Sequence, residues 1–556
     1  MVLPSRLSGL RHDAPYVFDG DGQRFVNAAL RAAADGNPQW FGFPGSTYIY
    51  PLAFVYRLMY TVEGGTTFAD YARHLADEPQ SGFVPARVVS ASASVLAIPA
   101  TAALALALDV SPPAALGAAA LVGLSRCHWA LAHLVRSDML LVLFATLASL
   151  FSVSAARGSA RAAVLGGAAA GLAMASKWPG VLAWLPVLLG IALSPRDEAP
   201  LTPRRRAAAV LVLTLAGAAL GAFASGWHYE WKELPGFESV PPEYRDGAEF
   251  LRRNLLALSA LILASGAAAL TVRSVARLAV RLGTDRRVWL SALALATAFC
   301  ACGPFVLTGG ESVVQGLVYE ARSQSLTERG EPGWRNLVSY VTGPLAEDLG
   351  PLGLVAGVAG LALLALRREH LPAVAFPCLW LGYYAFTNIR STRYVAVLIP
   401  PLAIGASHVV CRLLRRPGLV RALGVLALVA LVGLPALEIA RLQRESELPD
   451  TRALASDWFA TNVPKGRTVA AEEHSVHLCS HCYRIISPGA LYKMDRKPDL
   501  AITSSAVHDY FLRDPKRFAS EIQRYSDVLA SYARIVRFHP ADGIAQGPEI
   551  VIYVRR

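Results

Sequence analysis

A long series of apolar segments is the feature that most restricts what this chain can fold into. A helix needs about 20 mostly apolar residues to cross a bilayer, and in lipid every backbone polar group has to be satisfied internally. Charged residues make up only 17% of the 556 positions, below the roughly 25% of ordinary soluble domains, and the mean hydropathy is +0.39. We therefore expect a polytopic α-helical membrane protein.

The apolar segments predict about 12 spans. We place these at 85–108, 113–126, 138–155, 162–176, 179–194, 207–226, 252–272, 288–308, 350–366, 371–387, 394–411 and 422–438. The segments 113–126 and 162–176 are short and rich in Gly and Ala. Small residues such as Gly167 and Gly171, spaced by four, let helix backbones approach closely, so we expect these helices to pack against neighbours.

Arginines gather in alternate loops, as the positive-inside rule describes for the cytoplasmic side. The arginines concerned are Arg157 and Arg161; Arg196, Arg204, Arg205 and Arg206; Arg273, Arg277, Arg281, Arg286 and Arg287; Arg367 and Arg368; and Arg412, Arg415, Arg416 and Arg421. The net charge of +12 therefore reflects membrane topology and does not indicate nucleic-acid binding. This alternation of cytoplasmic and outward loops holds only if 46–62 does not cross the membrane. That segment contains Pro51, Arg57 and four tyrosines, and we expect it to lie in the interface as an amphipathic helix.

The remaining loops then face outward, which divides the chain into three parts. Residues 1–84 form a first external loop with interfacial helices, 85–438 form the transmembrane bundle, and 439–556 form a small external α/β domain. In this last part the pattern predicts helices at 450–460 and 514–532 and strands at 467–471, 500–503 and 550–554.

Five potential metal ligands lie close together in the external domain. They are His474, His477, Cys479, His481 and Cys482. A single C-x-x-C pair lacks the second half of a structural zinc site, and in an oxidising compartment a local disulfide is at least as good an explanation.

The outward loops hold acids and single cations close to the membrane. Lys177 stands alone in a Gly/Ala-rich hairpin, where an intramembrane charge is a functional candidate, although an interfacial lysine that snorkels explains it equally well. Asp138 follows Ser137 at the start of a helix, so it is either a functional acid or a residue that stabilises the helix N-terminus. Asp19, Asp21, Glu320, Arg393 and Tyr394 complete the candidates.

Several segments resemble the protein O-mannosyltransferase and aminoarabinose-transferase group of the GT-C superfamily. VFDGDGQRFVNAALRAAADGNPQWFGFPGSTYIYPLAFVYRL is similar to its first external loop, AHLVRSDMLLVLFATLASLF to its second-loop acid, and GGAAAGLAMASKWPGVLAWLPVLL to its lysine hairpin. GPFVLTGGESVVQGLVYEARSQ, RSTRYVAVLIPPLAI and LPDTRALASDWFATNVPKGRTVAA resemble later external parts. The order and shared membrane face of these segments carry the resemblance over nearly the whole chain.

Two features depart from the family pattern. The family's Asp-Glu pair is here Asp21-Gly22, and Asp19 could compensate for the missing acid. The family also has a helix before the first loop, which would bring the count to 13. We therefore expect either that translation begins further upstream or that the chain is a truncated product.

The resemblance implies a glycosyltransferase that moves a hexosyl or pentosyl unit from a polyprenyl-phosphate donor to a hydroxyl of a glycan, lipid or protein. It implies Asp21, helped by Asp19, as the general base, and Lys177 and Arg393 as ligands of the donor phosphate. Asp138 and Glu320 would orient the acceptor or hold a divalent metal, whose presence stays open, and no metal residue is assigned.

The resemblance also implies that Tyr394 lines the substrate groove. The tyrosines between 48 and 60 either join that groove or form an interfacial aromatic belt, and the belt is the better explanation. The expected location is the bacterial inner membrane, with the active face extracytoplasmic and no nucleic-acid partner.

Two other functions remain open. A transporter or flippase with an external cap is one, although transporters usually place ionisable groups near the midplane on broken helices. A catalytically degenerate relative is the other.

Overall fold

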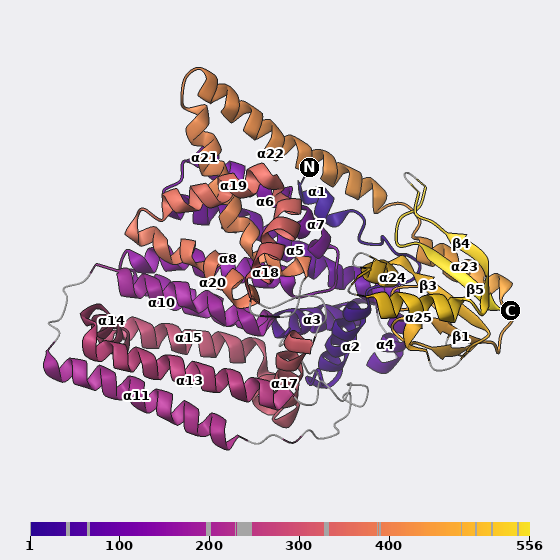
Figure 1. The fold of residues 1–556 in the computed structure, drawn as a ribbon, viewed down its shortest axis with the longest axis horizontal. Coiled ribbons are helices and arrows are strands. Elements are labelled where there is room, and N and C mark those ends of the chain that lie inside the picture. Colours follow the sequence, from indigo (N-terminus) through magenta and orange to yellow (C-terminus); the bar gives the residue numbers. More distant parts are fainter. Residues whose placement is uncertain are drawn as a thin grey trace.

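A bundle of helices fills most of the molecule, and a small α/β domain lies at one end of it (Figure 1). The computed structural model describes residues 2–556 except 40–44, 64–66, 196–201, 228–229, 231–246, 327–332, 386, 388–390, 480, 495–496, 513–514, 517 and 542–543. The N-terminus lies beside the bundle, whereas the C-terminus lies at the far end of the α/β domain (Figure 1).

Within the described part of the chain, a helix forms at each of the twelve predicted segments. These helices are α5 (Pro79–Ala107), α6 (Pro112–Gly123), α8 (Asp138–Ala156), α9 (Ala160–Ser176), α10 (Trp184–Leu193), α11 (Pro203–Gly226), α13 (Gly247–Thr271), α15 (Arg286–Cys302), α19 (Ala346–Leu364), α20 (Leu371–Ala385), α21 (Ile399–Leu414) and α22 (Leu419–Glu445). Among described residues, seven helices are long and apolar enough to span a bilayer, and α6 with α7 (Arg126–Ala132), bent by 55°, would make an eighth. The count of 12 spans therefore stays a prediction.

The short Gly-rich helix α9 packs backbone to backbone against α15. A Cβ atom built on Gly167 would lie 2.1 Å from the Ser291 carbonyl oxygen, and one on Gly171 would lie 2.3 Å from that of Leu295. Only glycine permits this approach, because any side chain would push the helices apart. The expected close packing of this helix is confirmed.

Residues 1–84, the predicted first external loop, contain helices that cover the end of the bundle nearest the α/β domain (Figure 1). They are α1 (Val2–Leu7), α2 (Gly20–Asp35), α3 (Ser46–Glu63) and α4 (Phe68–Asp77). On α3, the apolar side chains of Phe54, Leu58 and Val62 are exposed at helical spacing, as in a helix that lies along a membrane surface.

The aromatic-belt explanation is wrong for two tyrosines of α3. Tyr48 and Tyr56 are fully buried, and their hydroxyls donate to the carbonyl oxygens of Ala86 and Gly82. A buried phenol needs a hydrogen-bond partner, and these two find it on α5. They therefore anchor the first external loop to the bundle.

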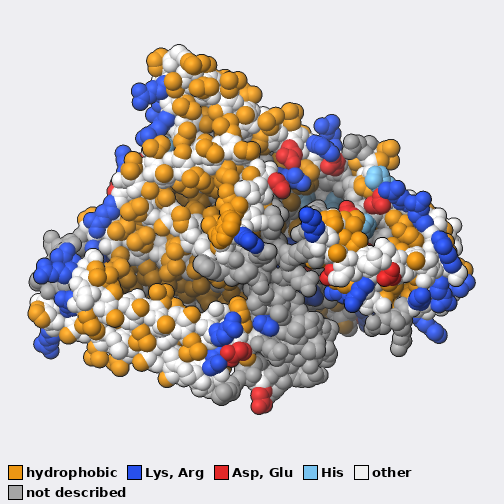
Figure 2. All heavy atoms as spheres, in the orientation of Figure 1, with side chains coloured by type: hydrophobic (Ala, Val, Ile, Leu, Met, Phe, Trp, Pro, Cys, Tyr) orange, Lys and Arg blue, Asp and Glu red, His pale blue; other side chains and the backbone are white. Residues whose placement is uncertain are grey.

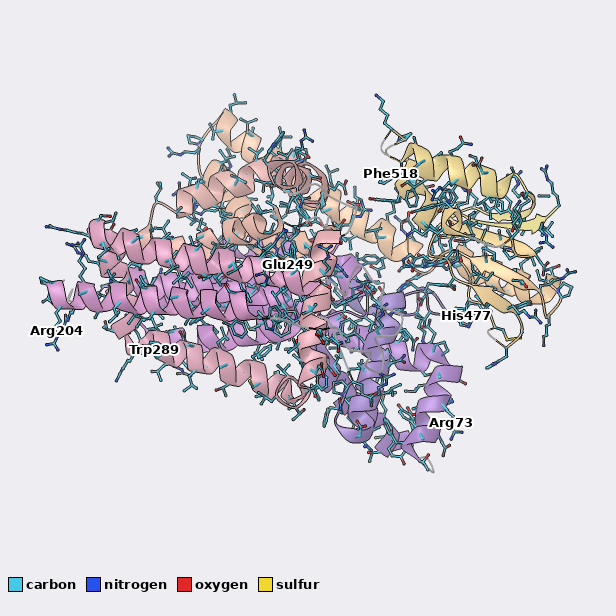
Figure 3. All side chains as sticks on the ribbon, turned by 60° about the horizontal axis from the view of Figure 1, so that its bottom comes forward. Arg73, Arg204, Glu249, Trp289, His477 and Phe518 are labelled. Carbon is cyan, nitrogen blue, oxygen red and sulfur yellow. A yellow bond between two sulfur atoms is a disulfide. The ribbon has the colours of Figure 1, made fainter. Side chains whose placement is uncertain are left out.

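The surface of the bundle separates charge from apolar side chains. Figure 2 shows orange apolar atoms over much of the bundle and blue Lys and Arg atoms along its left edge, beside α11 and α14 (Arg273–Thr284). In Figure 3, Arg204 lies at the end of the bundle opposite Arg73 of the first external loop and His477 of the α/β domain. Arg204, from a predicted cytoplasmic loop, thus lies away from these two residues of predicted external parts, while the side of the membrane that each part faces stays a prediction.

The α/β domain contains a five-stranded sheet in the order β2-β1-β3-β5-β4. The strands are β1 (Thr468–Ala471), β2 (Arg484–Ile486), β3 (Leu500–Ser504), β4 (Tyr532–Phe538) and β5 (Ile550–Arg555), with helices α23 (Thr451–Asn462), α24 (Ser505–Leu512) and α25 (Ala519–Leu529). Strand β1 is parallel to β2 and β3, whereas β5 is antiparallel to β3 and β4. The small C-terminal α/β domain expected from the sequence is therefore present, while its external location stays a prediction.

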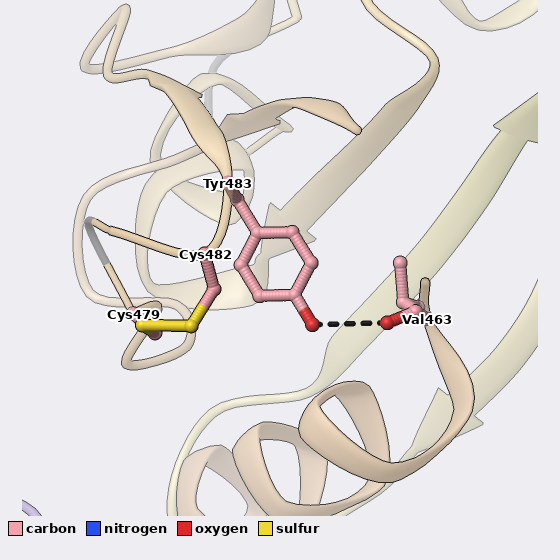
Figure 4. Close-up of a disulfide and its surroundings, with 4 residues drawn as sticks. All are labelled: Val463, Cys479, Cys482 and Tyr483. Atoms are coloured by element: carbon pink, nitrogen blue, oxygen red, sulfur yellow. Dashed lines mark hydrogen bonds between the residues drawn. A yellow bond between two sulfur atoms is a disulfide. The ribbon is translucent and has the colours of Figure 1, made fainter. Parts of the chain in front are cut away.

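One prediction for this domain needs correction, and one open choice is decided. The helix expected over 514–532 is shorter, because α25 ends at Leu529 and Tyr532 begins strand β4. Cys479 and Cys482 form a disulfide beside Tyr483, whose hydroxyl donates to the Val463 carbonyl oxygen at 3.0 Å (Figure 4). The pair is therefore a local disulfide in this structure, which was the alternative to zinc.

Candidate functional site

Helix α2 carries Asp21 in its first turn and is fixed in place by Asp19. The Asp19 carboxylate accepts from the Gly22 backbone N–H at 3.0 Å, which caps the helix, and from the Val135 N–H at 3.1 Å. The second bond ties α2 to the loop that precedes α8. Asp19 is buried and both its oxygens are occupied, so we assign it a positioning role and not the role of a second catalytic acid.

Residues 12–19, which we call the strap, lead the chain into α2. Within the strap, Asp13 forms a fully buried ion pair with Arg87 of α5 at 2.9 Å, and its Oδ2 also accepts from the Phe18 N–H at 3.0 Å. Arg87 donates in addition to the Leu10 carbonyl oxygen at 2.6 Å. These contacts fix the start of α2 relative to the bundle.

Two arginines hold the Asp21 carboxylate. Its Oδ2 lies 2.7 Å from Arg136 Nη1 and 3.6 Å from Arg393 Nη1. Burial alone would raise the pKa of Asp21, but the two guanidinium charges outweigh it and hold this pKa below its usual value. Asp21 is therefore ionised at neutral pH, and with 46% of its side chain exposed it remains accessible to a substrate.

A buried ion pair lies next to these arginines. Lys177, at the junction between α9 and the short 3₁₀ helix η1 (Trp178–Ala183), approaches Asp138 of α8 with Nζ 2.5 Å from Oδ1. Both side chains are almost completely buried, which disagrees with an interfacial lysine that snorkels. Ser137 donates to the Ser176 carbonyl oxygen at 2.9 Å and so holds the two helix ends together.

Lys177 and Arg393 both lie close to the ring of Tyr394. The ring of Tyr394, in η4 (Thr392–Leu398), lies 5.2 Å from Lys177 Nζ and 5.2 Å from Arg393 Cζ. Both are within the range at which a cation is attracted to an aromatic face. Tyr384 stacks on Tyr394 with centroids 4.4 Å apart, and Trp380 donates to the Tyr394 carbonyl oxygen at 2.7 Å. These contacts fix the ring that both cations face.

Glu320, on α17 (Glu311–Leu326), completes the group of charges. Burial raises its pKa, and the nearby charges of Lys177, Arg393 and Asp21 also act on it. The raised pKa favours the neutral acid, which can donate a hydrogen bond. Residues far apart in the sequence therefore act on one another at a single place, as their common loop face predicts.

Sequence reasoning did not assign a role to Arg136, which contacts both Asp19 and Asp21. Its only signal in the sequence is its position two residues before Asp138 in an outward loop. The departure at Gly22 also has a structural explanation. A Cβ atom there would lie 2.7 Å from Asp19 Oδ2 and 2.8 Å from its Cγ, so a second acid at this position would displace the Asp19 cap.

The site acids do not form a cluster of metal ligands. Within the described residues, such a cluster occurs at Asp109, Glu369 and His370, whose ligand atoms lie within 4.8 Å of one another. Asp109 already pairs there with Arg157 at 3.0 Å and Arg367 at 2.7 Å, which makes the group an ion-pair network between predicted cytoplasmic loops. The involvement of a divalent metal stays open.

Residues 69–194 match the family described as dolichyl-phosphate-mannose-protein mannosyltransferase. This segment contains Arg136, Asp138 and Lys177, and the match confirms the resemblance to protein O-mannosyltransferases. No curated protein matches the chain.

Two solved structures are similar in overall arrangement. One is the oligosaccharyltransferase of Archaeoglobus fulgidus, with a TM-score of 0.48, 12% identity, and 96% of this chain and 72% of that chain covered. The other is ArnT from Cupriavidus metallidurans bound to undecaprenyl phosphate, with a TM-score of 0.39, 14% identity, and 99% of this chain and 96% of that chain covered. These values are too low to bear on the chemistry of the site.

Proposed function

We propose that the chain transfers a sugar from a polyprenyl-phosphate donor to a hydroxyl of an acceptor at the extracytoplasmic membrane face. The observation that carries the proposal is the accessible Asp21 carboxylate between Arg136 and Arg393, beside the buried Asp138–Lys177 pair. The match over 69–194 supports the donor class, since the family description names a dolichyl-phosphate sugar. A glycosyl transfer from such a donor needs a base and cations for a phosphate in one place.

The proposed step exchanges one bond at the anomeric carbon of the sugar. The acceptor oxygen forms a bond to that carbon while the bond from the carbon to the phosphate oxygen breaks. The hydroxyl proton passes to Asp21, and the departing polyprenyl phosphate keeps the electron pair of the broken bond. Arg393 supplies a planar guanidinium that can engage two phosphate oxygens, so the charge that develops on the leaving group meets a cation already in place.

Binding of the donor would itself prepare Asp21 to act as a base. In the unliganded site, Arg136 and Arg393 hold the pKa of this carboxyl below its usual value, although burial raises it. A donor phosphate on Arg393 offsets one of these charges, and the pKa of Asp21 then rises. A carboxylate that becomes more basic only when the donor is bound avoids unproductive proton uptake from water.

Lys177 and Asp138 would act together behind the phosphate. An ammonium group has three donors, so the contact of Lys177 with Asp138 is compatible with a further one to a phosphate oxygen. Asp138 keeps the lysine oriented at the end of α9. Glu320, whose pKa is raised by burial, would form a hydrogen bond with an acceptor or sugar hydroxyl. Tyr394 would form one side of the groove.

The test is transfer of radiolabelled sugar from polyprenyl-phosphate donors in membranes that contain the chain, followed into lipid, glycan and protein fractions. Asp21→Asn removes the base and keeps the shape, and we expect activity to fall by about 10²–10⁴-fold. Asp70→Asn is the matched control, because Asp70 is an exposed acid of the same external loop that pairs with Arg73.

The result that supports the proposal is label transfer by the wild type and Asp70→Asn but not by Asp21→Asn. Equal transfer by all three would remove Asp21 as the base. An absence of transfer by folded wild-type protein, with every donor sugar, would overturn the proposal in favour of a transporter or a degenerate relative.

A further inference from the structure

A cleft of about 440 Å³ opens at one end of the sheet in the α/β domain. Its lining residues come from three strands (β1, β2 and β5) and the chain before β3: Thr468, Arg484, Ile485, Ile486, Lys497, Pro498, Asp499 and Arg555. Thr468, Arg484 and Asp499 lie at the N-terminal ends of parallel strands, and Arg555 ends the antiparallel strand β5. The cleft therefore lies at the end of the sheet where the parallel strands begin and β5 ends.

The cleft lies apart from the candidate active site. Arg555 is the last residue but one, and Figure 1 places the C-terminus at the end of the α/β domain away from the bundle. The ion pairs of Asp21, Lys177 and Arg393 described above are all with residues outside the cleft. A ligand in this cleft is thus held at a distance from the place where transfer is proposed.

Three cations and one acid line the cleft, which leaves an excess of two positive charges. Two of the cations are fixed by the fold. Arg555 donates to the Lys497 carbonyl oxygen at 2.9 Å and lies 3.7 Å from Asp499, while Lys497 Nζ donates to Ser531 Oγ at 2.9 Å. Such fixed cations lose little freedom when they bind an anion.

Arg484 is the third cation, on the edge strand β2. Its side chain is exposed and makes no hydrogen bond or ion pair with any described residue, although its backbone N–H bonds to the Arg467 carbonyl oxygen at 3.0 Å. A guanidinium is well suited to bidentate contact with a phosphate. The Asp499 carboxylate accepts from the Thr468 N–H at 3.0 Å, so it is already occupied and does not neutralise Arg484.

The remaining lining residues indicate which chemical group the ligand carries next to its anionic group. Ile485, Ile486 and Pro498 give the cleft apolar surface beside the cations, and the C–H face of a sugar ring packs well on such surface. The volume lies within the roughly 300–1,000 Å³ of small-molecule sites and far exceeds what one phosphate needs. A phosphomonoester carries about −1.5 to −2 charges at neutral pH, which matches the excess of two positive charges.

We propose that this cleft binds a phosphorylated saccharide. Because the α/β domain would face the cell envelope, we further infer that this ligand is part of the acceptor, held by a group remote from the reacting hydroxyl. That second step rests on the proposed function, whereas binding to the cleft does not.

The test is isothermal titration of the full-length chain in detergent with trehalose 6-phosphate, trehalose and inorganic phosphate. We expect one site for trehalose 6-phosphate, with the other two probes at least about tenfold weaker, since each lacks one half of the interaction. Arg484→Ala removes a charged hydrogen-bond donor and should weaken trehalose 6-phosphate by about tenfold or more. Arg524→Ala, an exposed arginine of α25 outside the cleft, should leave it unchanged.

Three outcomes would overturn the proposal. They are equal affinity for inorganic phosphate and trehalose 6-phosphate, no binding of trehalose 6-phosphate to folded protein, and the same affinity in Arg484→Ala and Arg524→Ala. Lys497→Ala replaces Arg484→Ala if the latter does not fold. The titration measures binding and needs no sugar transfer, so a failure to bind would not contradict the proposed transferase. Loss of transfer in Asp21→Asn would likewise not contradict binding in the cleft.

Discussion

The substitution Lys177→Met separates the structural role of the buried ion pair from its proposed role in phosphate binding. The Lys177 and Asp138 side chains are 7% and 5% exposed, with Nζ and Oδ1 2.5 Å apart. Loss of the lysine leaves a buried carboxylate without its closest partner, which typically destabilises a protein by about 3–5 kcal/mol. We expect the variant to be destabilised by that amount.

The expected change in melting temperature follows from the length of the chain. At about 2.1 cal/mol/K per residue, a chain of 556 residues has a melting entropy of roughly 1.2 kcal/mol/K. A loss of 3–5 kcal/mol then lowers the Tm by about 3–4 °C. Helices that persist in detergent reduce the entropy of unfolding, so the measured fall should be at least this large. Tryptophan fluorescence during heating in detergent measures it.

A double variant distinguishes the structural role of Lys177 from its proposed role in phosphate binding. Lys177→Met combined with Asp138→Leu removes both charges, and replacing a buried pair by apolar residues is often neutral or stabilising. We expect the Tm to return to the wild-type value while transfer activity stays lost. An unchanged Tm in Lys177→Met would refute the structural argument. Recovery of activity in the double variant would refute a direct role of either charge in catalysis.

Two further predictions concern the first external loop. Burial and the charge of Arg87 lower the pKa of His12 from 6.5 to about 4, so the unfolded chain binds more protons than the folded chain between these values. The free energy of unfolding should therefore rise with pH from about 4 to 6.5, and the Tm of His12→Gln should rise less over this range. Parallel plots of Tm against pH for the wild type and His12→Gln would contradict the lowered pKa of His12. Gly22→Ala should lower the Tm, because its Cβ would lie 2.7 Å from Asp19 Oδ2 and overpacking costs about 1–3 kcal/mol. Gly433→Ala, whose Cβ would have its nearest neighbour at 3.9 Å, is the control, and an equal effect of both would show that the Asp19 contact is unimportant.

Local patterns predict the helices of the bundle because lipid leaves the backbone few alternatives. The same reasoning fails in the α/β domain. No Gly or Pro between Leu529 and Tyr532 marks the end of the helix expected over 514–532, yet the chain turns there and β4 pairs with β5. Strand β2 has only three residues, too few for a periodic signal. In both cases contacts with distant strands decide the structure.

Charges close to apolar segments, together with the family resemblance, identified the members of the candidate site, but not how they pair. Lys177 and Asp138 are conspicuous because a charge near the membrane is costly. The contact of Arg136 with Asp21 joins residues more than 100 positions apart, and no local pattern contains it. The capping role of Asp19, and with it the reason for glycine at position 22, likewise depends on the Val135 N–H in another loop.

The α/β domain contributes to the site through the strap, residues 12–19. Tyr16 donates to Asp457 at 2.7 Å and stacks on His477, with centroids 5.1 Å apart, and His477 lies on the side of the domain that faces the first external loop (Figure 3). The Gln546 side chain donates to the His12 carbonyl oxygen at 2.8 Å.

The strap is thus held from two sides. The domain holds it at Tyr16, and α5 holds it at Asp13 through Arg87. Ordering a residue costs roughly 1–2 kcal/mol of conformational free energy, which a polar segment cannot recover alone. The strap ends at Asp19, two residues before Asp21. The position of the proposed base, which must be accurate for proton transfer, therefore depends on a domain that does not itself contact Asp21.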